Sequence, residues 1–110
     1  MIDWGRVAAL KEEVGPEDFD EVVELFLQEV DEEIGNLAVS LAGADLQEKL
    51  HFLKGSALSL GFEDFSNLCQ CGESALANDV KSDVDVAAIK ETYAVSRTFF
   101  LKELSEKLPG

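Results

Sequence analysis

A single histidine, His51, precedes Lys54 and Gly55 by three and four residues in the segment HFLKGSALSLGF, residues 51–62. A neutral imidazole has an ordinary pKa of about 6.5 and is a nucleophile near neutral pH, so it can form a covalent intermediate with an electrophilic group. A lysine one helical turn away would stabilise an anionic group on the ring, such as a phosphoryl group in transfer. A glycine would leave space beside the ring for the donor or acceptor. The spacing therefore predicts a site that accepts an anionic group and passes it on.

The helical pattern around His51 indicates that its ring faces solvent. At about 100° per residue, the apolar positions expected in the core of this helix cluster within about 40° of one direction, and His51 lies about 140° from it. This argues against a hydrogen-bonded histidine of the core. A plain surface histidine is the simplest alternative, and it would need no special neighbours. The five expected core positions are Leu46, Leu50, Leu53, Ala57 and Leu60.

The neighbours on the face of His51 are unusual for a solvated surface. Gly55 costs about 1 kcal/mol relative to alanine inside a helix, which is tolerated where a partner approaches the backbone closely. Leu58 and Phe62 add apolar area where polar side chains are expected, and such a patch commonly marks a docking surface. We therefore predict that a partner protein docks here, over Gln47, Leu58 and Phe62.

The chain lacks the groups that an enzyme with its own chemistry would need. It has no second histidine for a metal pair, no glycine-rich phosphate loop, no convincing set of Mg²⁺-binding carboxylates, and no serine or cysteine paired with a base. We expect no metal site, no cofactor of its own and no ATP site. The site is half complete, and a second protein would have to supply the rest. This is the behaviour of a carrier rather than an enzyme.

Length and charge narrow the class of protein further. A chain of 110 residues suits one domain, residues 1–110, with a single core. Acidic residues outnumber basic ones 23 to 9, for a formal net charge of −14, so nucleic acid and anionic membranes would be repelled. The first 48 residues contain fourteen of the acidic residues, and this leaves the part of the chain after them, with Lys49, Lys54 and Lys81, as the better place to meet an anionic group.

The termini and the cysteines indicate a cytoplasmic protein. The N-terminus lacks a basic segment followed by an apolar run, and no stretch reaches about 18 consecutive apolar residues, so we expect neither export nor a membrane span. Cys69 and Cys71 would point about 200° apart on a helix. We expect no disulfide and two reduced cysteines that serve as packing residues.

Apolar periodicity predicts two helices in the first 43 residues. A short helix over residues 3–14 has Asp3 as its N-cap and ends at Gly15. Pro16 suits the first turn of a longer helix that stops at Gly43. Its stripe alternates steps of four and three through Phe19, Val23, Phe26, Val30, Ile34, Leu37 and Leu41.

Three further helices complete the predicted fold. They cover residues 45–60 before Gly61, residues 63–78, and a final segment that runs from a capping box of Ser82 and Asp85 to Pro109. No β-alternation competes with this pattern. Four long helices with short connections predict an all-α fold, an antiparallel up-and-down four-helix bundle with the additional short N-terminal helix across one end.

The segment HFLKGSALSLGF resembles the signature of histidine-containing phosphotransfer (HPt) domains, in which His-x-Leu-Lys-Gly-Ser is followed by a small or apolar run to Leu-Gly. The similarity covers most of the chain. The second helix of the family is similar to the segment VGPEDFDEVVELFLQEV, and its fourth helix contains a Leu-Cys-x-x-Leu-Glu stretch that is similar to LCQCGE. Gly72 departs from that stretch by replacing a packing residue, which puts the tightness of packing there in question. The matching positions are His51, Leu53, Lys54, Gly55, Ser56, Leu60 and Gly61.

The resemblance implies a carrier that shuttles a phosphoryl group between aspartates of receiver domains in a two-component phosphorelay. His51 would be the phosphoacceptor, through Nε2, with Lys54 as the stabilising cation and Gly55 as the access residue. Ser56 matches the motif but lies about 140° from His51 on the helix, so local hydrogen bonding or small size explains it better. Because this chain offers only Lys54 for charge neutralisation, the receiver would bring Mg²⁺.

Two other functions remain open from the sequence. The chain could be a helical adaptor that binds a partner without chemistry, or the phosphoacceptor domain of a larger histidine kinase; its ends at element boundaries argue mildly against the second. The expected partners are response-regulator receiver domains, a hybrid histidine kinase, or both. A bundle that closes its own core needs no dimer, so we expect a monomer.

Overall fold

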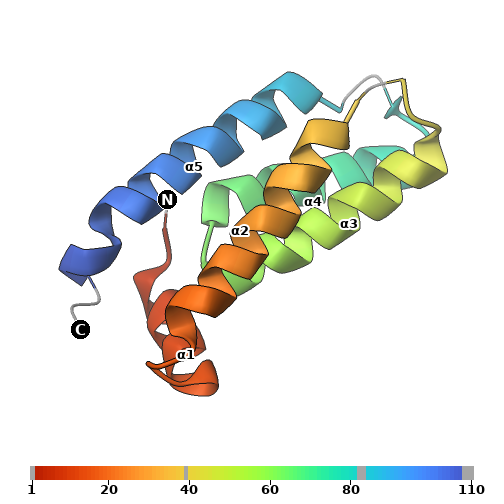
Figure 1. Ribbon diagram of the computed structural model, residues 1–110. Coiled ribbons are helices and arrows are strands. Elements are labelled where there is room, and N and C mark those ends of the chain that lie inside the picture. Colours follow the sequence, from red (N-terminus) through yellow and green to blue (C-terminus); the bar gives the residue numbers. More distant parts are fainter. Residues whose placement is uncertain (1, 39, 82–83, 108–110) are drawn as a thin grey trace.

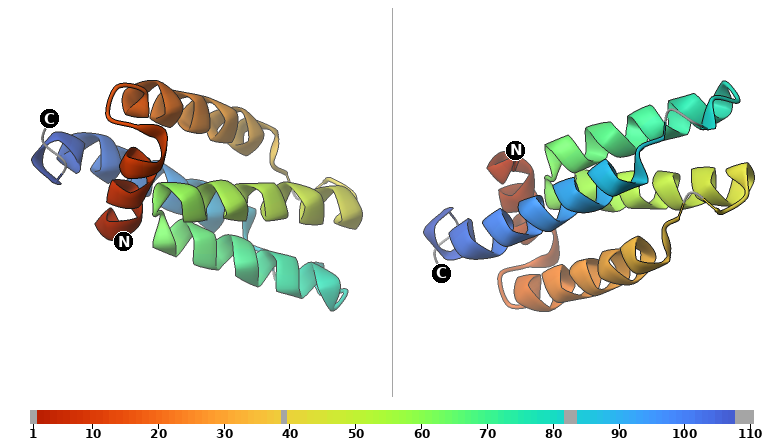
Figure 2. Two further views of the ribbon diagram at one scale, coloured as in Figure 1. Left: turned by 90° about the horizontal axis from the view of Figure 1, so that it is seen from below. Right: turned by 90° about the horizontal axis from the view of Figure 1, so that it is seen from above.

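In the computed structural model the chain folds into five helices, with residues 2–38, 40–81 and 84–107 described (Figure 1). Helices α2 to α5 run antiparallel along the long axis of a molecule of 45 × 20 × 20 Å, and α1 lies across one end (Figure 2). This confirms the predicted all-α bundle with its short N-terminal helix. The helices are α1 (Trp4–Val14), α2 (Phe19–Asn36), α3 (Gly43–Leu60), α4 (Glu63–Ala77) and α5 (Val86–Lys107).

The ends of α1 and α5 follow simple capping chemistry. The backbone N–H of Arg6 donates to Asp3 Oδ1 at 3.1 Å and caps α1, which ends at Gly15 as predicted. At the start of α5, the N–H of Ala88 donates to Asp85 Oδ1 at 2.9 Å, so Asp85 is a cap. Asp85 is thus the N-cap itself and not the third residue of a helix opened by Ser82, so the predicted start of this helix was wrong. Ser82 and the predicted stop at Pro109 lie outside the described residues.

The second helix is shorter than its apolar spacing predicted. It ends at Asn36, and Leu37 is extended, with φ −75° and ψ 125°. Gly35 and Asn36 have poor helix propensity, and Leu37 turns into the core, where it is buried. Gly43 is therefore not a stop but the first residue of α3, and residues 37–42 form the connection that reverses the chain. The prediction of one continuous helix up to Leu41 was wrong.

Helix α3 carries the most deeply buried stripe of the bundle. All five of its predicted core residues are buried, and Ser56 joins them. In α2 the buried side chains are Phe19, Val23, Leu27 and Val30. Leu27 takes the place predicted for Phe26, which is only partly buried. None of the described helices is both long enough and apolar enough to cross a membrane.

The corner between α3 and α4 depends on Gly61 and Phe62. Gly61 adopts the left-handed conformation, with φ 76°, and a Cβ there would lie 2.6 Å from the backbone oxygen of Asp3. The N–H of Asp3 donates to the Gly61 carbonyl at 2.7 Å, and Ile2 forms an isolated bridge with Phe62. Because the helix has already ended, Phe62 no longer follows the helical direction of His51. Its ring turns into the core and packs near Tyr93 and Phe100.

Gly72 is a point of tight packing, which answers the question raised by its departure from the family pattern. A Cβ at Gly72 would meet Leu50 Cδ1 at 2.7 Å, so the side chain of Leu50 occupies the space that a larger residue would need. One turn earlier, Cys69 is buried in the core. Burial and the nearby charge of Glu73 raise the pKa of its thiol to about 12. Cys71 is also free but exposed, so the prediction that it packs in the core was wrong.

A polar cluster connects α5 to α2. The Tyr93 hydroxyl donates to Asp31 Oδ1 at 2.5 Å, and Arg97 Nε lies 3.2 Å from the same oxygen. Burial, followed by the hydrogen bond and the charge of Asp31, raises the pKa of Tyr93 above its ordinary value of 10.0. The protonated phenol is therefore favoured by folding, and this contribution to stability is present below about pH 10 and is lost as the pH rises further.

Titration of Tyr93 tests this cluster directly, because Tyr93 is the only tyrosine. We expect the ultraviolet absorbance of tyrosinate to appear at higher pH in the folded protein than in denaturant. Asp31→Asn should lower the pKa of Tyr93 but keep it above 10.0, because the ring stays buried. Tyr93→Phe should reduce the loss of stability above about pH 10, measured by denaturant unfolding. An ordinary midpoint in the folded parent protein would contradict the assignment.

Candidate functional site

His51 lies in the middle of α3 on the side that faces solvent. Its side chain is 73% exposed, while Leu50 and Leu53 on the opposite side of the same helix are fully buried. The prediction that the imidazole points away from the core is therefore confirmed. The ring lies at the α4 side of the exposed face, where it meets one side chain from that helix.

That side chain is Glu73, whose Oε2 lies 3.2 Å from His51 Nδ1. An ionised carboxylate can only accept a hydrogen bond, so the hydrogen of the neutral ring belongs on Nδ1. The lone pair is then on Nε2, the ring nitrogen farther from the backbone. The contact with Glu73 selects the ring nitrogen that is able to act as a nucleophile and holds the orientation of the ring.

Lys54 contacts the same carboxylate from the other side. Its Nζ lies 3.0 Å from Glu73 Oε1 and donates to Gln70 Oε1 at 3.0 Å. The Glu73 side chain is only 14% exposed, and a carboxylate at that depth requires a compensating charge. Lys54 therefore neutralises Glu73 in this structure, and it reaches the imidazole through that carboxylate rather than by a direct contact.

Gly55 lies on the exposed face of α3 in open space. A Cβ at this position would meet no atom within 4 Å. Unlike Gly61 and Gly72, which close contacts require, Gly55 has no packing reason to be a glycine. The open surface beside His51 is therefore compatible with the predicted access role.

The structure separates the three predicted docking residues. Gln47 lines a hollow of about 350 Å³ together with His51 and Glu73, and Leu58 is 57% exposed. Phe62 is fully buried, so its prediction as a docking residue was wrong. The prediction assumed that the helix continues to Phe62, whereas the chain leaves the helix at Gly61. Ser56 is also buried, in agreement with a role in packing rather than in chemistry.

Two residues of the site were not assigned from the sequence. Glu73 is the last residue of the LCQCGE stretch. The resemblance of this stretch to the family pattern was the one signal in the sequence that pointed to Glu73. Its contact with His51 joins residues 22 positions apart, so only the packing of α4 on α3 creates it. Phe52 is 41% exposed directly beside His51, and its position about 100° around the helix from the histidine could have indicated a surface aromatic residue.

The described residues bring the imidazole of His51 together with one carboxylate and one ammonium group. Among them, no three His, Cys, Asp or Glu side chains come together in a way that could hold a metal ion. The only cation in contact with the Glu73–His51 pair is Lys54, again within the described part of the chain.

Comparison with known protein families identifies this arrangement. A family model described as Hpt domain matches residues 21–108, a range that includes nearly all of α2, the whole of α3, α4 and α5, and every residue of the site. No curated protein and no solved structure matches the chain in the corresponding comparisons. The match covers most of the chain, and the helical bundle with its exposed histidine agrees with it. The chain belongs to the Hpt domain family, whose members take part in histidine phosphotransfer in two-component phosphorelays.

Proposed function

We propose that this protein is a phosphocarrier in which His51 accepts a phosphoryl group from the aspartyl phosphate of a receiver domain and passes it to another aspartate. The observation that carries the proposal is the contact between His51 Nδ1 and Glu73, because it leaves Nε2 as the nucleophile on an exposed ring. The open surface at Gly55 supports approach by a second protein.

The reaction follows from the protonation state of the ring. Nε2 attacks phosphorus in line with the bond to the aspartyl oxygen; the N–P bond forms as the P–O bond breaks, and the aspartate leaves as a carboxylate. The ring keeps its hydrogen on Nδ1 and becomes cationic, so no proton has to be removed. Glu73, 3.2 Å from Nδ1, stabilises that positive charge. The reverse transfer uses the same geometry, and the partners set its direction.

Lys54 has an electrostatic role in this mechanism. An uncompensated carboxylate at Glu73 would repel the incoming phosphoryl oxygens, and the ion pair at 3.0 Å removes that repulsion. The remaining negative charge of the phosphoryl group needs a further cation, and we propose that Mg²⁺ bound by the receiver supplies it. We further propose that the carrier is a monomer, because its bundle closes its own core. We also propose that it is cytoplasmic, which its two free cysteines support.

Replacement of the histidine tests the function itself. His51→Gln should abolish acceptance of phosphate from a panel of phosphorylated receiver domains and should leave the melting temperature almost unchanged, because the side chain is exposed. Acid-labile label on the parent protein, followed on gels, is the measurement. Label that persists in His51→Gln would refute the assignment, and an adaptor without chemistry would never acquire label at all.

Replacement of the carboxylate tests the positioning of the ring. Glu73→Gln should slow phosphate acceptance by on the order of tenfold, because the amide no longer stabilises a cationic ring and can donate to Nδ1 instead of accepting from it. Nitrogen NMR of the imidazole should show a loss of the Nδ1–H tautomer, which a merely structural role would not change. Glu63→Gln, the same change at the exposed first residue of α4, is the matched control and should alter neither quantity. A parental rate and tautomer in Glu73→Gln would contradict the role of Glu73.

Gly55 tests access, because stability and function should change in opposite directions. Gly55→Ala should raise stability by about 0.5–1 kcal/mol through helix propensity and a less flexible unfolded chain, while Gly55→Gln should at least keep it. Both should lose transfer from receivers in order of side-chain size. Gly35→Ala is the control, since Gly35 is a second glycine of a helix with open space around it and lies away from His51. A stable Gly55→Gln protein with parental transfer rates would overturn the access role.

A further inference from the structure

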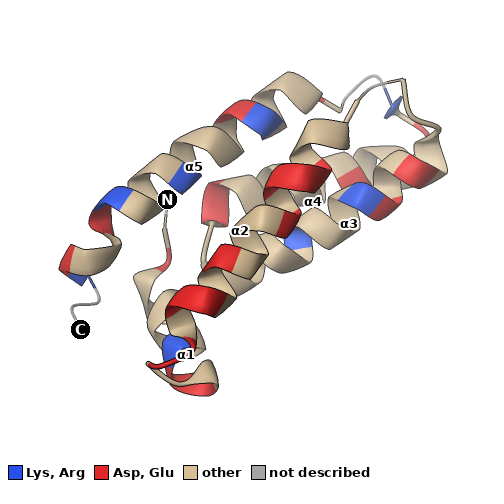
Figure 3. Ribbon diagram, viewed as in Figure 1, with Lys and Arg blue, Asp and Glu red and all other residues tan. Residues whose placement is uncertain are grey.

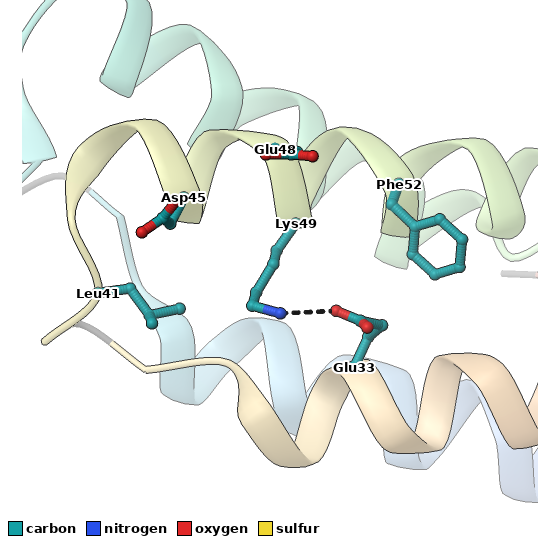
Figure 4. Close-up of a pocket in the computed structure, with 6 residues that line it drawn as sticks. All are labelled: Glu33, Leu41, Asp45, Glu48, Lys49 and Phe52. Atoms are coloured by element: carbon teal, nitrogen blue, oxygen red, sulfur yellow. Dashed lines mark hydrogen bonds and ion pairs between the residues drawn. The ribbon is translucent and has the colours of Figure 1, made fainter.

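A second hollow lies on the side of α3 that faces α2 (Figure 4), and Phe52, the residue after His51 in the chain, forms part of its wall. It has a volume of about 470 Å³, and its walls come from α2, from α3 and from the segment that connects them. Figure 4 shows Leu41 and Asp45 at one end, Phe52 at the other, and the ion pair of Lys49 with Glu33 between them. The lining residues are Glu33, Leu41, Asp45, Glu48, Lys49 and Phe52.

This hollow and the hollow at His51 share a wall. Glu48 lines both of them, and Phe52 is the residue next to His51 in the chain. A receiver domain that brings its aspartate to His51 would therefore also cover the opening beside α2. A standard protein interface buries about 800 Å² on each partner, which is ample to span two adjoining hollows.

The charges of the hollow favour a cation. Lys49 Nζ pairs with Glu33 Oε2 at 2.9 Å, so these two charges compensate each other. Asp45 and Glu48 make no hydrogen bond or ion pair within the described residues. The hydrogen bond with Glu33, followed by the charges of Glu33, Asp45 and Glu48, raises the pKa of Lys49. The nearby Lys81 ammonium is held by the backbone oxygen of Leu41.

The surroundings strengthen this bias. Helix α2 contributes Glu33 to the opposite wall. The helix as a whole has seven acidic residues and no basic one (Figure 3), so its field is negative although the other six do not line the hollow. The apolar part of the lining is Leu41 and the half-exposed ring of Phe52. A long aliphatic stem can pack on such groups while its charged end reaches a carboxylate, and an aromatic face also attracts a cation.

We propose that this hollow receives one lysine or arginine side chain of the receiver domain, and that Asp45, Glu48 and Phe52 thereby help to select the receiver. The inference rests on the proposed function, because it concerns the partner that docks over His51. A receiver with an acidic or short polar residue at the facing position would leave the two carboxylates unpaired or repelled. Such a receiver would be discriminated against.

The test compares charge variants with a receiver chosen as the fastest phosphodonor of a panel. Glu48→Lys, alone and combined with Asp45→Asn, should lower kcat/KM for transfer to His51 by about tenfold at low ionic strength and leave the maximal rate nearly unchanged. The loss should shrink as salt is added. Glu91→Lys makes the same change of net charge in α5, the helix behind α3 in the left view of Figure 2, and should have little effect.

Two further measurements make the result decisive. Phosphorylation of His51 by phosphoramidate needs no docking, so it measures any direct effect of Glu48→Lys on the ring, because Glu48 also lines the hollow at His51. The loss of transfer from the receiver should exceed any change in this rate. Exchange of the facing lysine or arginine of the receiver for glutamate should weaken transfer to the parent carrier and restore it with Glu48→Lys.

A parental kcat/KM in the double variant would overturn the inference, and so would an equal loss in Glu91→Lys. Labelling of His51 by phosphoramidate in the same proteins would show that the proposed function still holds. A parent protein that never acquires phosphate from either donor would overturn the proposed function and the inference together.

Discussion

The carboxylate of Glu73 is the group on which the site depends. It lies between α3 and α4, within 3.2 Å of an imidazole nitrogen and 3.0 Å of a lysine ammonium, and it is mostly shielded from water. A carboxylate at this depth is compensated by the ammonium of Lys54, and it accepts the hydrogen of His51 Nδ1 in turn. Glu73 of α4 can reach both residues of α3 only if the two helices pack in the correct register. The rest of the bundle provides that register.

The register is determined at the corner of the two helices and along their packed faces. At the corner, Gly61 in the left-handed conformation brings the chain back, and the backbone of Asp3 pairs with it. Along the faces, Leu50 fills the space above Gly72 so closely that a Cβ there would lie 2.7 Å from Leu50 Cδ1 and would force the leucine side chain to move. The absence of a side chain at Gly72 thus brings α4 near to α3, one residue before Glu73. Phe62, anchored among Tyr93 and Phe100, ties the same corner to α5.

The surface around His51 has the opposite character. Gly55 and Leu58 lie in the open, Phe52 exposes part of its ring, and none of them improves the stability of the isolated domain. A glycine in the middle of a helix costs stability, and exposed apolar side chains gain nothing until a partner covers them. In the proposed reaction, the close packing below the histidine and the unfilled surface around it would serve the same purpose, because a second protein would have to reach a ring that Glu73 orients.

The sequence alone was sufficient for the features that depend on local pattern. Helical periodicity predicted the all-α bundle, the buried stripe of α3 and the exposure of His51, because each of these is a property of one helix. The spacing of His51, Lys54 and Gly55 supplied the hypothesis of phosphotransfer, and the match to the Hpt domain family supports it. Features that join distant residues were decided by tertiary structure. The pairing of His51 with Glu73, the placement of Lys54 on that carboxylate and the hollow between α2 and α3 require helices to pack, and no periodicity in one segment encodes that contact. The errors have the same origin: Phe62 and Leu37 continue a helical pattern in the sequence, but the chain had to turn at both places to bring its helices side by side, and burial in the shared core prevailed over local spacing.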